Sequence, residues 1–262
     1  MKGKVLLLSL VVVALCGSSA LALAPMGPTT PSLKKGQWGF GAEYTGVDMK
    51  LSRSATTGSF KDPDNISLMY MNMETNQYSV VVRRGITDNW EGFARIGFAD
   101  MEYDRPAGSG EWQGDDDDIF LGLGARAAIW EQTPCLRWGI LGQATWAEFN
   151  GSRANPSSSE VFGKFEIEYT ELQIAVGPTW TPKEWDWLSI YGGVFYHDLD
   201  GYHTFWHADD YREYPLREHD DLGFYIGGQV AASEKVTITI EFMDTGDADA
   251  LVLGAMWVPN GL

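Results

Sequence analysis

The chain has 262 residues, of which 36 are Asp or Glu and 19 are Lys or Arg, so its formal net charge is −17. A hydrophobic content of 44% and an aromatic content of 13% exclude a disordered chain. The acidic balance argues against a nucleic-acid-binding protein, which needs a basic face to displace counterions from phosphates. Beyond residue 25, no apolar run approaches the roughly 20 residues that a membrane-spanning helix requires.

Residues 1–22 are typical of an export signal. Lys2 and Lys4 form a charged end, residues 5–15 form an apolar stretch, and small side chains provide a cleavage site near residues 20–22. The mature chain is therefore expected to leave the cytoplasm.

The two cysteines carry little structural information. Cys16 stands where a lipoprotein cysteine could stand, but Leu15 precedes it instead of a small residue, which favours an ordinary signal segment. Cys135 is then alone in the mature chain, which excludes a disulfide framework.

Strand periodicity covers almost all of the remaining chain. A short Pro-rich lead, residues 23–35, is expected in the periplasm, and residues 259–262 form a C-terminal tail. Between them, apolar and polar side chains alternate and no 3.6-residue period stands out; Trp38 and Phe40, for example, are separated by Gly39. Ten segments are predicted as strands: about 36–50, 67–85, 90–103, 118–130, 135–149, 162–181, 187–198, 221–232, 236–244 and 249–258.

The connections between these segments alternate in length. Long polar loops are expected at 51–66, 104–117, 150–161 and 199–220, and short turns between the other segments. This pattern predicts an all-β, transmembrane, up-and-down antiparallel β-barrel over residues 36–258, with ten strands and with eight or twelve as alternatives. A soluble sandwich or a lipocalin-like barrel would alternate equally well.

The composition of the two strand faces favours the membrane. One face carries Trp, Phe, Ile, Leu and Val, whereas the other is rich in Gly, Thr, Gln, Glu and Arg and cannot form a dense core. A membrane barrel turns its oily face outward, with aromatic girdles near the strand ends. Such girdle residues are Trp38, Trp90, Leu136, Trp138, Trp146 and Trp257.

The hairpin of residues 78–103 contains the run VVVRRGITDNWEGFARIG at positions 80–97. It resembles the strand, periplasmic turn and returning strand of small bacterial outer-membrane barrels, the group of opacity, attachment-invasion and OmpA-like proteins. The resemblance implies an outer-membrane monomer surrounded by lipid and inserted by periplasmic chaperones and the barrel assembly machinery. Such barrels usually end on an aromatic residue, whereas here five residues follow Trp257.

Alternation also predicts a charged lumen. Arg83 or Arg84 is expected to join it, depending on a bulge, and a second bulge is expected at Thr170 or Glu171. These charges fit either a selective pore or a network of Arg and Glu pairs that fills a narrow barrel. The predicted lumen residues are Glu43, Glu91, Arg95, Arg126, Arg137, Glu166, Glu168, His197 and Glu241.

The outer loops offer a second candidate site, which is acidic and aromatic. A ligand could stack on the aromatic rings, although packing of a loop on itself explains them equally. His203 and His207 could approach a metal if their loop were helical, but solvated loop charge is the simpler interpretation and no metal is predicted. The candidate binding residues are Trp112, Asp115, Asp116, Tyr202, His203, Trp206, His207 and Tyr211.

No catalytic group can be assembled from these residues. Residues 115–118, all Asp, opposite His197 or His203 with Asp200, do not reproduce the Asp-x-His arrangement of omptin-type proteases. Ser189 lies about 26 Å along its strand from His197. We therefore expect no enzyme activity and no cofactor. The leading hypothesis is a structural or binding barrel that displays its loops to an external ligand; a small passive pore is the alternative, and a barrel-mouth hydrolase comes third.

Overall fold

The computed structural model describes residues 23–56, 66–104, 112–114, 118–154, 161–207, 210–218 and 221–259. Nearly all of this part of the chain is β-strand, and its single helix is the short 3-10 turn η1 (Lys183–Trp185). None of its helices is long and apolar enough to cross a bilayer. The strands are β1 (Trp38–Thr56), β2 (Ile66–Thr87), β3 (Trp90–Asp104), β4 (Trp112–Gly114), β5 (Asp118–Thr133), β6 (Leu136–Ala154), β7 (Val161–Trp180), β8 (Leu188–His207), β9 (Asp210–Arg217), β10 (Leu222–Ala231), β11 (Val236–Asp244) and β12 (Ala248–Trp257).

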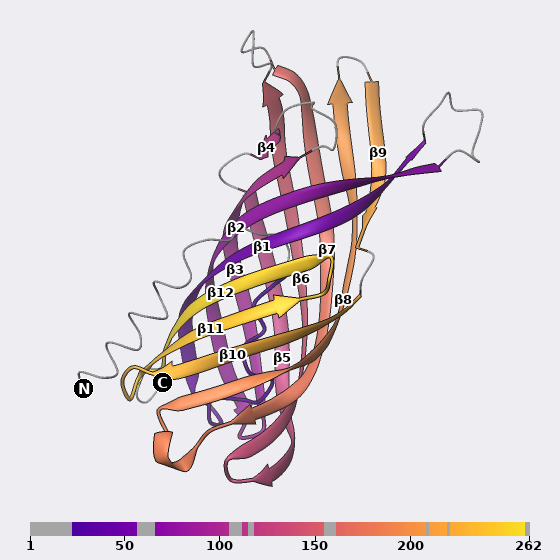
Figure 1. The fold of residues 1–262 in the computed structure, drawn as a ribbon. Coiled ribbons are helices and arrows are strands. Elements are labelled where there is room, and N and C mark those ends of the chain that lie inside the picture. The colour runs from indigo at the N-terminus through magenta and orange to yellow at the C-terminus, as the bar shows by residue number, and fades with distance from the viewer. Residues whose placement is uncertain are drawn as a thin grey trace.

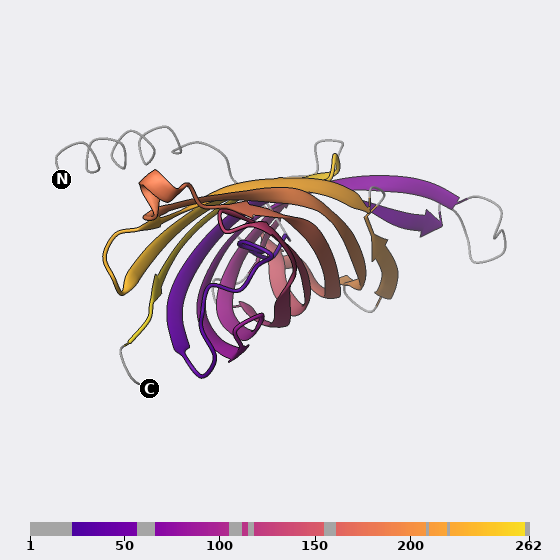
Figure 2. The same cartoon turned by 90° about the horizontal axis from the view of Figure 1, so that it is seen from below.

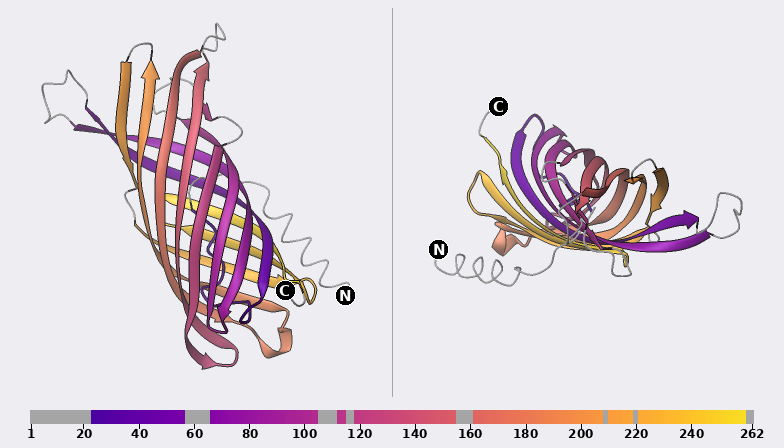
Figure 3. Two further views of the ribbon diagram at one scale, coloured as in Figure 1. Left: turned by 180° about the vertical axis from the view of Figure 1, so that it is seen from behind. Right: turned by 90° about the horizontal axis from the view of Figure 1, so that it is seen from above.

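The strands form a closed barrel. Apart from β4–β5 and β9–β10, strands that follow one another in the chain pair antiparallel, and β12 pairs with β1 from Ala248 to Trp257, which closes the sheet (Figures 1 and 3). The two short strands only extend others: β4 lies between β3 and β6 beyond the end of β5, and β9 continues the line of β10 beside β8. The predicted all-β, up-and-down barrel of ten strands is confirmed.

The circumference of the barrel changes along its length. Above the turn between β11 and β12, strand β9 pairs directly with β1, at Arg217↔Ser52 and Leu216↔Arg53. The ring there consists of β1, β2, β3, β4, β6, β7, β8 and β9, whereas β10, β11 and β12 complete the ring of ten below. One hairpin, β11–β12, therefore accounts for the difference.

Short turns lie at one end of the barrel and long strand extensions at the other (Figure 1). The turns are residues 88–89, 134–135, 181–187 and 232–235, as expected. The expected loop 199–220 is instead largely a hairpin, since β8 runs to His207 and β9 begins at Asp210. The strands are longer than the sequence segments mainly at this end.

Near the short turns, the barrel has an apolar outer face. Val80, Ile96, Leu123 and Val194 point outward and remain 55 to 68% exposed, while their strand neighbours point inward and are buried or half-buried. Ile119, Leu121, Ile140, Leu172, Ile174, Phe224, Ile226 and Trp257 are also exposed. This surface suits lipid and is the reverse of a soluble barrel.

Toward the other end the polarity of the two faces is inverted. Phe149, Phe165, Ile167 and Tyr169 point inward and are buried, and the rings of Phe149 and Tyr169 stack with centroids 5.8 Å apart. They belong to one apolar cluster inside the barrel, which also includes Met49, Met73, Met101 and Leu199. The upper part of the barrel thus has apolar side chains inside and polar ones outside, as a soluble protein does.

This inversion corrects two expectations. The bulge at Thr170 or Glu171 is absent, because β6 and β7 pair without a shift from Leu136↔Trp180 to Arg153↔Gly163. Glu166 and Glu168, expected in the lumen, accordingly lie on the outer face, where Glu168 accepts a hydrogen bond from Trp146 Nε1 at 3.0 Å. The alternation of apolar and polar residues in β7 changes phase here because its outer face changes from apolar to polar. The strand itself continues without a bulge.

The two faces predict different responses to charge. Ile140→Lys places an ammonium group on the outer apolar face and should cost about 2 to 4 kcal/mol of unfolding free energy near the bilayer midplane. Thr239→Lys points inward, toward the polar lumen, and should cost less than half as much. Urea unfolding of both variants in lipid vesicles measures the difference, and equal losses would contradict a lipid-facing outer surface.

Candidate functional site

Most of the Pro-rich segment of residues 23–35 lies inside the barrel, and its last residues, Lys34 and Lys35, are exposed at the short turns. Leu23, Met26 and Thr29 are fully buried and Leu33 nearly so, and seen from below the indigo segment runs within the ring of strands (Figure 2). It was expected as a periplasmic lead, and that placement is wrong. The structural reason is that the lumen offers this segment hydrogen-bond partners from strands all around the barrel.

Lumen carboxylates accept the backbone N–H groups of the segment. Glu241 on β11 accepts from Met26 N at 2.9 Å and Gly27 N at 2.8 Å. Glu91 on β3 accepts from Ser32 N at 2.9 Å and Leu33 N at 3.1 Å. Higher in the lumen, the Glu171 carboxylate on β7 is 3.2 Å from Ala24 N.

Gly27 allows one carboxylate to bind two successive amides. Its φ of +66° lies in the left-handed region, which favours glycine. A Cβ at this position would also lie 3.2 Å from the guanidinium of Arg126. Glycine therefore serves both the backbone turn and the close approach of the arginine.

Lumen cations and amides donate to the carbonyl groups of the same segment. Arg126 on β5 donates to Pro28 O at 2.7 Å and Met26 O at 3.0 Å, and Arg95 on β3 donates to Pro25 O at 2.9 Å. Further bonds to carbonyls come from Arg137 to Pro31 at 3.3 Å and from Gln143 to Ala24 at 3.0 Å. An extended, Pro-rich segment cannot satisfy its own backbone groups, so these side chains replace water.

The charged lumen residues also pair with one another. Glu43 accepts from Arg83 and Arg95, each at 2.9 Å, and Glu91 lies 3.6 Å from Arg126 and 4.0 Å from Arg83. All five side chains are at most 7% exposed. Buried charges are tolerated only when they are paired and hydrogen-bonded, as they are here.

A second buried polar group lies where β9 gives way to β10. The His197 ring stands between two carboxylates, with Nε2 3.1 Å from Glu171 and Nδ1 in contact with Glu218. Glu218 also accepts from the Thr245 hydroxyl, in the β11–β12 turn, at 2.7 Å, and Gln173 donates to Glu171 at 2.6 Å. Every member is buried, so this row joins β7, β8 and the hairpin β11–β12 without an opening for a substrate.

The predicted lumen residues are thus partly brought together. Glu43, Glu91, Arg95, Arg126, His197 and Glu241 are buried inside the barrel, Arg137 is half-buried, and Glu166 and Glu168 lie outside it. Arg83 points inward, and β2 needs no bulge there, since its pairing with β3 is continuous from Asn72 to Gly85. Sequence reasoning missed Glu218, Gln143 and Gln173, which carry no motif.

The candidate outer-loop residues do not form one site in the described part of the chain. Tyr202 is half exposed on β8, whereas His203 on the same strand points inward and is fully buried near Phe165. His203 and His207 lie on a strand, where a spacing of four residues places them about 13 Å apart, so the helical metal pair does not form.

The remaining loop residues are described less fully. Trp206 is half-buried. Trp112 and Tyr211 lie in β4 and β9, but their side chains, like that of His207, are outside the described structure. Asp115 and Asp116 fall outside the described residues. Among the residues that the structure describes, no group of three or more His, Cys, Asp or Glu side chains could hold a metal ion.

Comparisons with known proteins find similar folds and no sequence relatives. No family model matches the chain, and no curated protein matches it. The translocator domain of the autotransporter NalP from Neisseria meningitidis is 11% identical over 86% of this chain and 89% of its own, with a TM-score of 0.49.

Two other solved structures are similar to the same extent. The outer-membrane protease OmpT from Escherichia coli is 8% identical over 85% of this chain and 94% of its own, with a TM-score of 0.48. The outer-membrane protein OprG from Pseudomonas aeruginosa is 10% identical over 87% and 98%, with a TM-score of 0.46. OmpT and OprG are outer-membrane proteins, but at identities of 8 to 11% and TM-scores below 0.5 the activities of these three proteins carry no weight for this chain.

The buried charge network predicts a large effect of removing one member. Glu91→Ala would leave Arg126 without its carboxylate and two amides of the lumen segment without an acceptor, and should cost about 3 to 5 kcal/mol of unfolding free energy. Asp200→Ala removes the exposed pair of Asp200 with Arg217, whose side chains are 67% and 75% exposed, and should cost less than about 1 kcal/mol. Urea unfolding in vesicles compares the two, and similar losses would contradict a structural role for the lumen network.

Proposed function

We propose that this protein is an exported outer-membrane β-barrel whose lumen is closed by its own N-terminal segment, and which presents its long hairpins outside the cell in a structural or binding role. The occupied lumen carries this proposal. Residues 23–33 exchange hydrogen bonds with side chains of the neighbouring strands β3, β5, β6 and β7 and of β11 across the ring. A segment held at so many points leaves little room for a solute to pass.

The outer surface supports a membrane position with a defined upper limit. In the register of the sheet, Glu102, Glu74, Asp48, Asp249 and Asp244 lie side by side on the outer face of β3, β2, β1, β12 and β11. Such a row of carboxylates cannot face hydrocarbon, whereas the apolar band lies just below it. We infer that the bilayer surrounds the barrel between the short turns and this row.

The inverted upper part supports the role of the hairpins. Beyond the acidic row, the barrel carries its apolar side chains inside and its charged ones outside, as a protein surrounded by water does. The hairpins β1–β2, β6–β7 and β8–β9 extend in this direction (Figure 1). They are therefore the surface that an external partner meets.

Single-channel recording tests the closed lumen. The mature chain, refolded in planar bilayers, should be silent, whereas a chain that begins at Lys34 should conduct because the lumen segment is gone. A synthetic peptide of residues 23–33 should block the shortened barrel again, which shows that the shortened chain is folded. Steady conductance by the full mature chain would overturn the proposal and favour the passive pore.

The topology can be tested with the native cysteine. Cys135 lies in the short turn between β5 and β6, so a membrane-impermeant maleimide should leave it unlabelled in intact cells and label it once the envelope is opened. The control replaces Cys135 by Ser and Ser158, in the connection between β6 and β7, by Cys; this variant should react in intact cells. The opposite pattern of labelling would place the long hairpins in the periplasm.

A further inference from the structure

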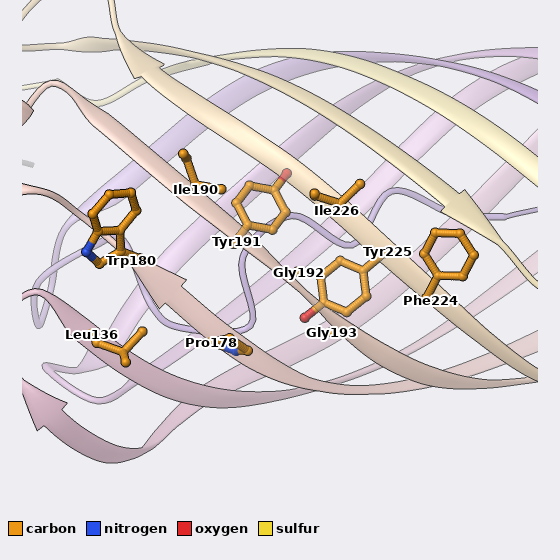
Figure 4. Close-up of a pocket in the computed structure, with 10 residues that line it drawn as sticks. All are labelled: Leu136, Pro178, Trp180, Ile190, Tyr191, Gly192, Gly193, Phe224, Tyr225 and Ile226. Atoms are coloured by element: carbon orange, nitrogen blue, oxygen red, sulfur yellow. The ribbon is translucent and has the colours of Figure 1, made fainter.

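The outer face of the barrel carries a groove over β7, β8 and β10. Its volume is about 500 Å³, and Figure 4 shows the residues that line it. None of them is charged. They are Leu136, Pro178, Trp180, Ile190, Tyr191, Gly192, Gly193, Phe224, Tyr225 and Ile226.

The groove lies where the pairing of β7 with β8 is interrupted. Val176 pairs with Val194 and Thr179 with Tyr191, but the residues between them do not pair. Pro178 has no N–H to donate, and Gly192 adds no side chain to the outer surface. The wall is therefore thin here, and the neighbouring large side chains stand above it as the sides of a groove.

The groove is closed on the lumen side. Gly177 is not paired with β8, and its carbonyl accepts the Thr29 hydroxyl of the N-terminal segment at 2.9 Å. Tyr191 and Tyr225 point inward beneath the same stretch and are each only 2% exposed. The groove is thus a blind site open only to the outside.

We propose that this groove binds one acyl chain of a membrane phospholipid. Its sides, formed by Trp180, Ile190, Phe224 and Ile226, are 39 to 56% exposed and belong to the apolar outer face. An empty apolar groove in contact with lipid would lose dispersion contacts, which an inserted chain restores. The inference requires the barrel to lie in the membrane but does not depend on a closed lumen.

The position of the groove indicates the leaflet. Leu136 and Trp180 begin and end strands at the short turns 134–135 and 181–187, so the groove opens near the end of the barrel predicted to face the periplasm. No lining residue of the groove is charged, so nothing there would hold a charged headgroup. The site therefore recognises the chain, and the headgroup stays near the girdle at Trp180.

Photo-crosslinking on the unmodified barrel locates the lipid. The refolded chain is placed in vesicles of phosphatidylethanolamine that contain a trace of the same lipid with a diazirine in its acyl chain, and excess lipid is removed with detergent before illumination. Crosslinks should concentrate on residues 178–193 and 222–228. An even distribution over all outward-facing strands would overturn the proposal.

A matched pair of variants measures retention of the lipid. Ile190→Trp with Ile226→Trp fills the groove, whereas Ile96→Trp with Leu123→Trp adds the same bulk to the outer face of β3 and β5, away from it. Native mass spectrometry should find about tenfold less lipid retained by the first variant and no change in the second. Equal retention by both variants would show that the lipid binds elsewhere.

Discussion

The backbone of the N-terminal segment imposes the central constraint on this structure. Three prolines at positions 25, 28 and 31 keep the segment extended and prevent it from forming strand or helix hydrogen bonds. Inside a barrel each remaining N–H and C=O must still find a partner. The charges of the lumen provide those partners: carboxylates at the N–H groups, and guanidinium and amide groups at the carbonyls.

This constraint explains why the lumen contains both positively and negatively charged residues. A carboxylate such as Glu91 binds backbone amides through Oε2 while its Oε1 lies 3.6 Å from Arg126, so its charge is balanced and one oxygen is hydrogen-bonded. An apolar lumen would pack well but would leave the segment unsatisfied. The segment and the charges therefore depend on each other: if either is removed, the other is left without hydrogen-bond partners.

Alternation along the strands was enough to predict the class of fold, the strand number and the inward position of Glu43, Arg95 and Arg126. It failed at Glu166 and Glu168, because an alternating pattern shows two faces without saying which one is inside. Along the same strand the outer face changes from apolar to polar, and β7 follows the change without a bulge.

The occupied lumen could not be predicted from the sequence. The partners of the segment are distant in the chain, since Met26 lies 215 residues from Glu241 and Ala24 lies 147 residues from Glu171. Residues 23–35 show no periodicity and resemble an ordinary linker. One sequence signal could have indicated the occupied lumen. More charged residues point into this narrow lumen than pairing among themselves requires, which indicates that some of them bind backbone N–H and C=O groups.

The step from ten strands to eight shows how girth is controlled in this sheet. Strand β1 meets two different strands along one edge, β12 in its lower half and β9 in its upper half. The hairpin β11–β12 therefore widens only the lower half of the barrel, where the lumen segment lies. The barrel is thus wider at the end where the lumen segment joins β1, beside the short turn in which Asp88 accepts from Lys35 N.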